Sequence, residues 1–198
     1  MKNILIIDCC IRSNSRTREL LNTFITGIDD SYRITHLQLT TMNLQPLMNE
    51  FFNEREQLLN NKKLNHLRFN LAHQLASADE IIVAAPFWDL SFPSLLKIYF
   101  ENCCVDGITF KSTAQGIDGL CQANNFVYLT TRGGFYTNDP MEQAVPYLRS
   151  LSSFFGVHQF HAIAADGMDI VNFDSHQSLE NAKKEAYDLA KLLFGNAE

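Results

Sequence analysis

The amino-acid sequence predicts an α/β fold, in which helices cover both faces of one parallel sheet. Two continuous apolar runs, residues 4–7 and 81–85, show no alternation, which is typical of strands buried on both faces. Strand-like and helix-like segments alternate along the rest of the chain, which is the order that builds a parallel sheet. Because a length of 198 residues suits one domain, we expect a single domain over residues 1–198.

The composition argues against several functional classes. The hydrophobic share of 46% is that of a globular protein, and the net charge of −6 leaves no basic stripe for nucleic acid. No apolar stretch approaches membrane-spanning length, and a strand begins directly after residues 1–3, so we expect neither a membrane protein nor a signal peptide. The cysteines show neither metal-ligand nor disulfide spacing and favour a cytoplasmic location; they are Cys9, Cys10, Cys103, Cys104 and Cys121.

The stretch 80–102 organises the chain. Its buried strand ends at Pro86, and a loop over residues 87–90 follows, with the only tryptophan, Trp88. Pro93 then begins a helix. Ligands of open α/β sheets lie at the carboxyl ends of strands, so this loop is the first candidate for a site. A loop that only packs against the core is the alternative.

The loop after the first strand, residues 9–17, is rich in Ser and Asn and leads into a helix. This arrangement presents backbone N–H groups and a helix dipole to an anion. The loop contains no glycine, so neither the P-loop nor the dinucleotide-binding fingerprint is present. An ordinary N-capped helix with a solvated basic edge is the alternative.

The remaining segments complete the alternation. In chain order, the sequence predicts an edge strand at 32–39, a loop at 40–49, one bent helix or two helices over 51–78 with a break at 60–63, a hairpin at 107–122, a strand at 126–131, a helix from 139 to 156, a strand at 157–164, and a final helix from 174 or 175. We expect Asp139 to cap its helix and Pro146 to kink it. His158 and His161 point to opposite faces of their strand, so we expect no metal site.

Right-handed crossovers favour the flavodoxin-like strand order 2-1-3-4-5, a three-layer sandwich around a five-stranded parallel sheet. In that order the crevice lies between the first and third strands, and FMN is its usual occupant. The loops 9–17 and 87–90 should face each other there, with residues 132–134 alongside. The paired glycines of that turn let a flat ligand approach the backbone, although a plain tight turn is the alternative.

The chain resembles the family of FMN-dependent NADH:quinone oxidoreductases and azoreductases over nearly its full length. The matching stretches are MKNILIIDCCIRSNSRT, ADEIIVAAPFWDLSFPSLLKIYFE, GITFKSTAQGIDGL, YLTTRGG and PYLRSLSSFFG. The resemblance implies three groups of FMN contacts: Cys10, Ser15, Arg16 and Thr17 at the phosphate; Phe87, Trp88, Asp89 and Leu90 along the isoalloxazine; and Thr131, Arg132, Gly133 and Gly134 at its pyrimidine edge.

Three residues depart from the family's pattern. Cys10 stands where the family has serine, so one hydroxyl donor to the phosphate is lost. Asp89 replaces an asparagine; when ionised it cannot donate to the flavin, and it disfavours a negatively charged reduced flavin. Trp88 replaces a tyrosine, which keeps the stacking area but removes the hydroxyl. We expect FMN binding to survive on backbone donors.

The resemblance implies ping-pong two-electron transfer from NADH or NADPH, through FMN, to a quinone or azo compound, with no catalytic side chain. A one-electron flavodoxin-type carrier and a flavin-free interaction domain of the same fold stay open as alternatives.

We also expect a homodimer with the sites at its interface, because the chain carries more apolar surface than one subunit covers. The residues assigned to the substrate side of the site are Phe110, Phe154 and Phe155. The resemblance implies that Phe110, on the hairpin, reaches the partner's flavin. In the alternative, it folds back on its own subunit.

Overall fold

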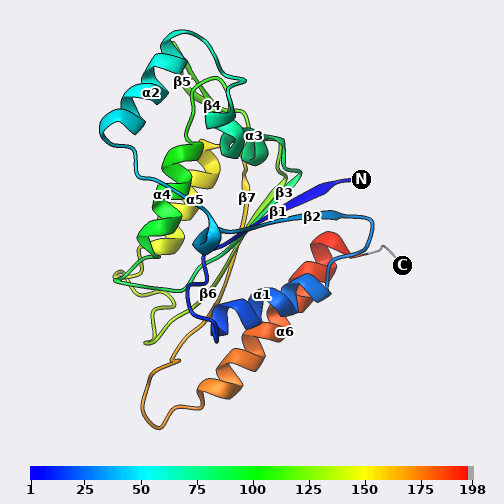
Figure 1. The fold of residues 1–198 in the computed structure, drawn as a ribbon. Coiled ribbons are helices and arrows are strands. Elements are labelled where there is room, and N and C mark those ends of the chain that lie inside the picture. The colour runs from blue at the N-terminus through cyan, green and yellow to red at the C-terminus, as the bar shows by residue number, and fades with distance from the viewer. Residues whose placement is uncertain (196–198) are drawn as a thin grey trace.

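The computed structural model describes residues 1–195 and confirms an α/β fold built on a five-stranded parallel sheet (Figure 1). The strands of this sheet are β1 (Asn3–Asp8), β2 (Arg33–Gln38), β3 (Glu80–Ala84), β6 (Asn125–Thr131) and β7 (Gln159–Ala165). Their order is β2-β1-β3-β6-β7, and every neighbouring pair is parallel. This is the predicted flavodoxin-like order, because the intervening β4 (Phe110–Thr113) and β5 (Gly116–Gly119) form a separate sheet.

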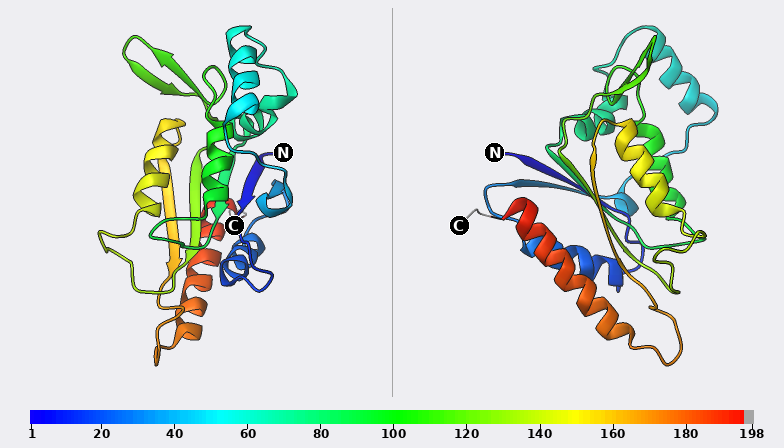
Figure 2. Two further views of the ribbon diagram at one scale, coloured as in Figure 1. Left: turned by 60° about the vertical axis from the view of Figure 1, so that its left-hand side comes forward. Right: turned by 180° about the vertical axis from the view of Figure 1, so that it is seen from behind.

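Helices cover both faces of the sheet, which makes three layers (Figure 2). On one face, Ile4 and Ile6 of β1 pack with residues of α1 (Arg16–Thr26) and α6 (Ser175–Phe194). On the other, Leu5 and Ile7 pack with residues of α3 (Asn70–Ser77), α4 (Ser94–Cys103) and α5 (Ala144–Phe154). The continuous apolar run of β1 therefore serves two cores. Within residues 1–195, no helix is both long and apolar enough to cross a membrane.

The segment 51–78 forms two helices rather than one bent helix. α2 (Asn49–Asn60) ends close to Lys62, whose φ of 54° interrupts the helical backbone within the predicted break. The short 3₁₀ turn η2 (Leu67–Phe69) then leads into α3, and a similar turn, η1 (Leu39–Thr41), follows β2. Phe69 packs with Val105 and Ile108 in a small third core beneath α2.

The predicted hairpin is confirmed as the antiparallel pair β4 and β5. Figure 1 places it at the same end of the molecule as α2, opposite the start of α1. The hairpin leads into the start of β6, so it lies at the amino edge of the sheet. α1 follows the end of β1 and begins at the carboxyl edge, so within one chain the two are far apart.

The predicted start of α5 at Asp139 is wrong, because the helix begins at Ala144. The Asp139 carboxylate instead accepts from the N–H of Met141 in the preceding turn, at 2.8 Å. Glu142 takes over the capping, since its carboxylate accepts from the N–H groups of Ala144 and Val145, each at 3.1 Å. Pro146 therefore lies in the first turn, where a missing N–H removes no helical bond, and it does not interrupt the helix.

Candidate functional site

A cavity of about 320 Å³ opens at the carboxyl edge of the sheet. Its walls come from residues 11–12 and 14–17 after β1, 86–88 after β3, 131–133 at the end of β6, and 168–169 after β7. The three loops singled out in the sequence thus meet at one place. The predicted site residues that line the cavity are Ser15, Arg16, Thr17, Phe87, Trp88, Thr131, Arg132 and Gly133.

The amino end of α1 offers unpaired backbone donors to this cavity. Ser15 is the N-cap, and its hydroxyl accepts from the N–H of Arg18 at 3.3 Å. The N–H groups of Arg16 and Thr17 have no acceptor among residues 1–195. Two free N–H groups and the positive end of a helix dipole can together bind an anion.

The side chains of Arg16 and Thr17 are tied to other loops. Thr17 is buried, and its hydroxyl shares a 2.7 Å hydrogen bond with the hydroxyl of Thr131. Arg16 Nη1 donates to the Met168 carbonyl at 3.0 Å and to Asp169 Oδ1 at 3.1 Å. At this helix end, the backbone is therefore freer than the side chains to bind a ligand.

Asp8 supports the loop after β1 from beneath, and the sequence analysis missed it. Its buried carboxylate accepts from the Cys10 N–H at 2.7 Å and from Arg18 Nε at 3.2 Å, and it lies 3.3 Å from His36 Nε2. Burial alone would raise the pKa of Asp8, but the hydrogen bonds from Cys10 and Arg18 outweigh it and hold that pKa below its usual value. Arg18 also donates to the carbonyl groups of Cys10 and Arg12. The only sequence signal was an acidic residue at the end of an apolar strand.

The loop after β3 is a tight two-residue turn. The N–H and C=O groups of Trp88 and Ser91 pair with each other at 3.0 and 2.8 Å. Between them, Asp89 and Leu90 have φ values of 49° and 67°, the left-handed backbone of a type I′ turn. This turn places Trp88 on the cavity and Asp89 outside it, in a neighbouring groove between α4 and α5.

The loops after β6 and β7 are joined by backbone hydrogen bonds. The N–H of Arg132 donates to the Ala165 carbonyl, and the N–H groups of Met168 and Asp169 donate to the carbonyls of Arg132 and Gly133. A Cβ on Gly133 would lie only 2.7 Å from Asp169 Oδ2. A side chain at position 133 would therefore displace the exposed Asp169 carboxylate. Met168 and Asp169 were missed because their loop shows no local pattern.

Several predicted site residues do not line the cavity. Cys10 is buried, its N–H is held by Asp8, and desolvation raises the pKa of its thiol. Phe110 and Phe154 lie against each other with ring centroids 4.7 Å apart, and Phe155 is fully buried in the core. The remaining ones, all outside the lining, are Asp89, Leu90 and Gly134.

The donor set suits an organic anion better than a metal ion. Within residues 1–195, no group of three or more His, Cys, Asp or Glu side chains is placed to hold a metal. The cavity instead combines a helix amino end with the aromatic side chains of Phe87 and Trp88. Such a cavity can hold a flat aromatic molecule that carries a phosphate group.

Comparisons with known proteins place the chain among related sequences. A family model described as "Flavodoxin-like fold" matches residues 2–189. The FMN-dependent NADH:quinone oxidoreductase 2 of Clostridium acetobutylicum is 42% identical over 130 residues, 64% of this chain and 65% of that protein. The chain therefore spans about two thirds of the length of the first relatives that it matches. The FMN-dependent NADH:quinone oxidoreductase of Lachnoclostridium phytofermentans is 32% identical over 96% of this chain and 99% of its own length.

Two solved structures share the fold. The azoreductase from Bacillus anthracis str. Sterne superposes with a TM-score of 0.87 at 22% identity, covering 98% of this chain and 100% of the other. The FMN-dependent NADH-azoreductase from Bacillus anthracis str. Ames Ancestor, solved in complex with FMN, gives 0.86 at the same identity and coverage.

Proposed function

Because the chain belongs to the family of FMN-dependent NADH:quinone oxidoreductases, we propose that it binds FMN and transfers electrons from NADH or NADPH to quinones or azo compounds. The observation that carries this proposal is the cavity in which a phosphate-ready helix end, an aromatic loop and a glycine turn meet. Its volume of about 320 Å³ lies within the usual range of small-molecule sites.

The residues present fit FMN. The free N–H groups of Arg16 and Thr17 would hold the phosphate, and the helix dipole would favour its charge. Phe87 and Trp88 would line the isoalloxazine, and Gly133 would let the pyrimidine edge approach the backbone. The carboxylate of Asp169, which would repel a phosphate, is already paired with Arg16.

FMN, when bound, can accept a hydride from a nicotinamide nucleotide and pass two electrons to an acceptor. We propose a ping-pong order, in which the oxidised nucleotide leaves before the acceptor stacks at the same place. The chain's own residues bind, orient and shield, and none acts as a nucleophile or general base.

We also propose a cytoplasmic homodimer of one-domain subunits, since Phe110 could reach a site only across an interface.

The visible spectrum of the purified protein tests the proposal. We expect flavin bands in the oxidised protein, bleaching of those bands on anaerobic addition of NADH, and their return when a quinone is added. A protein that cannot be loaded with FMN would instead be the flavin-free interaction domain. A protein that binds FMN but is not reduced by NADH would be the one-electron carrier.

A further inference from the structure

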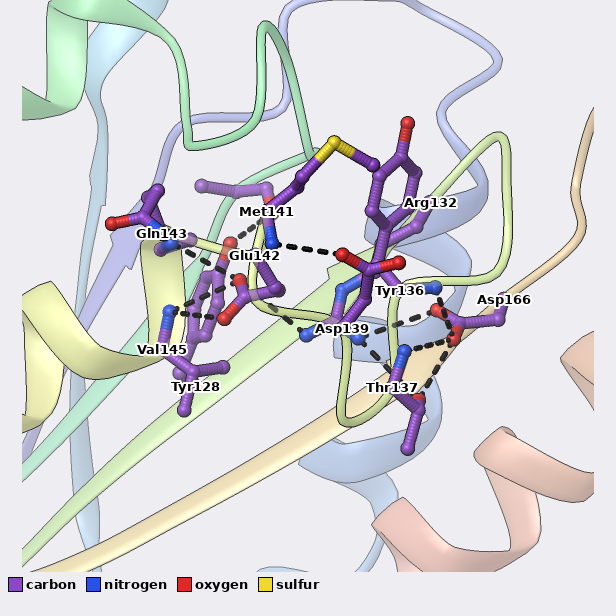
Figure 3. A network of polar contacts seen from close by, with 12 residues as sticks. Tyr128, Arg132, Tyr136, Thr137, Asp139, Met141, Glu142, Gln143, Val145 and Asp166 are labelled. Carbon is purple, nitrogen blue, oxygen red and sulfur yellow. Dashed lines mark hydrogen bonds and ion pairs between the residues drawn. The ribbon is translucent and has the colours of Figure 1, made fainter.

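Arg132 lines the cavity, but its side chain is buried, with only 4% of it exposed. Its Nη1 donates to Asp166 Oδ1 at 3.3 Å, and its Nη2 lies 3.5 Å from Glu142 Oε1 (Figure 3). Its buried Nε has no partner among residues 1–195. The guanidinium therefore forms ion pairs with two carboxylates.

Asp166 connects Arg132 to the turn after β6. Its Oδ2 accepts from the N–H groups of Tyr136 and Thr137, at 3.0 and 2.8 Å, and from the Thr137 hydroxyl at 2.7 Å. These bonds place the Tyr136 ring against Phe87, with 4.6 Å between the ring centroids. Phe87 is part of the aromatic wall of the cavity.

Glu142 passes the other contact on to the start of α5. Its carboxylate accepts from the N–H groups of Ala144 and Val145, which fixes the first turn of the helix. The adjacent Gln143 N–H donates to the Leu90 carbonyl at 2.9 Å. The tip of the 86–91 loop is thus attached to the helix end that Glu142 caps.

Arg132 also reaches this loop directly, because its Cζ lies 5.6 Å from the centroid of the Phe87 ring. We propose that Arg132 is a positioning residue whose side chain fixes the 86–91 loop through Asp166, Glu142 and Phe87, and so shapes the aromatic wall against which the ligand would lie. The proposed function supplies the identity of that ligand, and the positioning itself does not depend on it. Arginine suits the role because its planar fork can bind two carboxylates at once, whereas a lysine ammonium on a flexible stem cannot hold the same geometry.

The variant Arg132→Lys tests this role, and Trp88 provides the readout. Trp88 is the only tryptophan and lies in the 86–91 loop, so its fluorescence in the flavin-free protein reports on the loop directly. We expect its emission to move to longer wavelength and its quenching by acrylamide to increase. In FMN titrations, the Kd should rise about tenfold, which equals roughly 1.4 kcal/mol. The matched control is Arg149→Lys on α5, whose guanidinium lies over Phe160; it should leave both readouts unchanged.

Arg132 has two sets of contacts, or arms: one through Glu142 to α5 and one through Asp166 to residues 136–137. Two further variants test each arm separately, and they test the positioning role even if Arg132→Lys does not fold. Glu142→Gln weakens the arm to α5, and Asp166→Asn weakens the arm to residues 136–137; each should shift Trp88 emission in a protein with a native circular dichroism spectrum. The proposal is overturned if emission and quenching match the wild type in folded Arg132→Lys, or in both arm variants. Because these readouts need no flavin, a wild-type chain that fails to bind FMN would refute the proposed function alone.

Discussion

The guanidinium of Arg16 lies 3.1 Å from the carboxylate of Asp169, and this ion pair joins the start of α1 to the loop after β7. The two residues are 153 positions apart in the chain. Both line the candidate cavity, so the pair places a carboxylate beside the helix end that would bind a phosphate.

Asp169→Asn should tighten FMN binding. The change frees Arg16 and removes a negative charge that repels the phosphate, so we expect the Kd to fall about two- to fivefold, the range of an exposed ion pair. Folding stability should stay within about 0.5 kcal/mol, because the two side chains are 45% and 76% exposed. Fluorescence titration with FMN measures the change. Asp188→Asn, at an exposed position of α6, is the control, and weaker binding in Asp169→Asn would mean that Asp169 itself holds the ligand.

Asp8→Asn should destabilise the fold at neutral pH. The variant removes the charge that pairs with Arg18 beneath the first loop, and we expect a loss of about 2 kcal/mol in the free energy of unfolding. The folded pKa of Asp8 is lower than its ordinary value of 3.8, so this contribution is complete above that value and is lost as the pH falls through the folded pKa.

The difference between wild type and Asp8→Asn should therefore shrink on acidification. Urea unfolding at pH 7 and at about pH 3 measures it, with the exposed Asp188→Asn as a control that changes little at either pH. A difference that stays constant or grows toward acid would show that the Asp8 carboxylate is not stabilised by its partners in the folded state.

Most of the fold could be predicted because the signals are local. The unalternating runs in β1 and β3 identified buried strands, and these in turn fixed where loops must meet. The start of α5 was misplaced since Asp139 and Pro140 form a good capping sequence, and only the tertiary contact of Glu142 with Arg132 shows which turn the helix uses.

The residues that line the cavity were harder to predict than the position of the cavity in the fold. The loops after β1, β3 and β6 carry hydroxyl, aromatic and glycine residues that stand out in the sequence. Asp169 has no such pattern, and its place depends on the register of β7 against β6. The direction of the Arg132 side chain was likewise invisible, because it is set by two carboxylates that follow it at positions 142 and 166.

Leu90→Gly should stabilise the turn after Trp88. Leu90 has a φ of 67°, which costs a branched side chain about 1–2 kcal/mol and glycine almost nothing. Part of this gain is offset by the greater freedom of glycine in the unfolded chain, so we expect a net gain of about 0.5 kcal/mol. Thermal unfolding measures it. Leu67→Gly, at an exposed leucine without a positive φ, should lose stability. A similar loss in Leu90→Gly would show that the backbone of Leu90 is not strained.

The position of Phe110 allows a test of whether two subunits share each site. On one chain its ring lies against Phe154, and Phe110 begins β4, whose hairpin Figure 1 shows at the end of the molecule opposite the start of α1, so it cannot reach the cavity of its own subunit. If a second copy brings it there, light scattering should give a mass near twice 22.5 kDa. Phe110→Ala should then lower quinone turnover about tenfold, as expected for an interface aromatic, with little change in FMN retention. Tyr187→Ala, on α6 at the other face of the sheet, is the matched control. A monomer that reduces quinones at the full rate would refute the shared site, because Phe110 could not contribute to it.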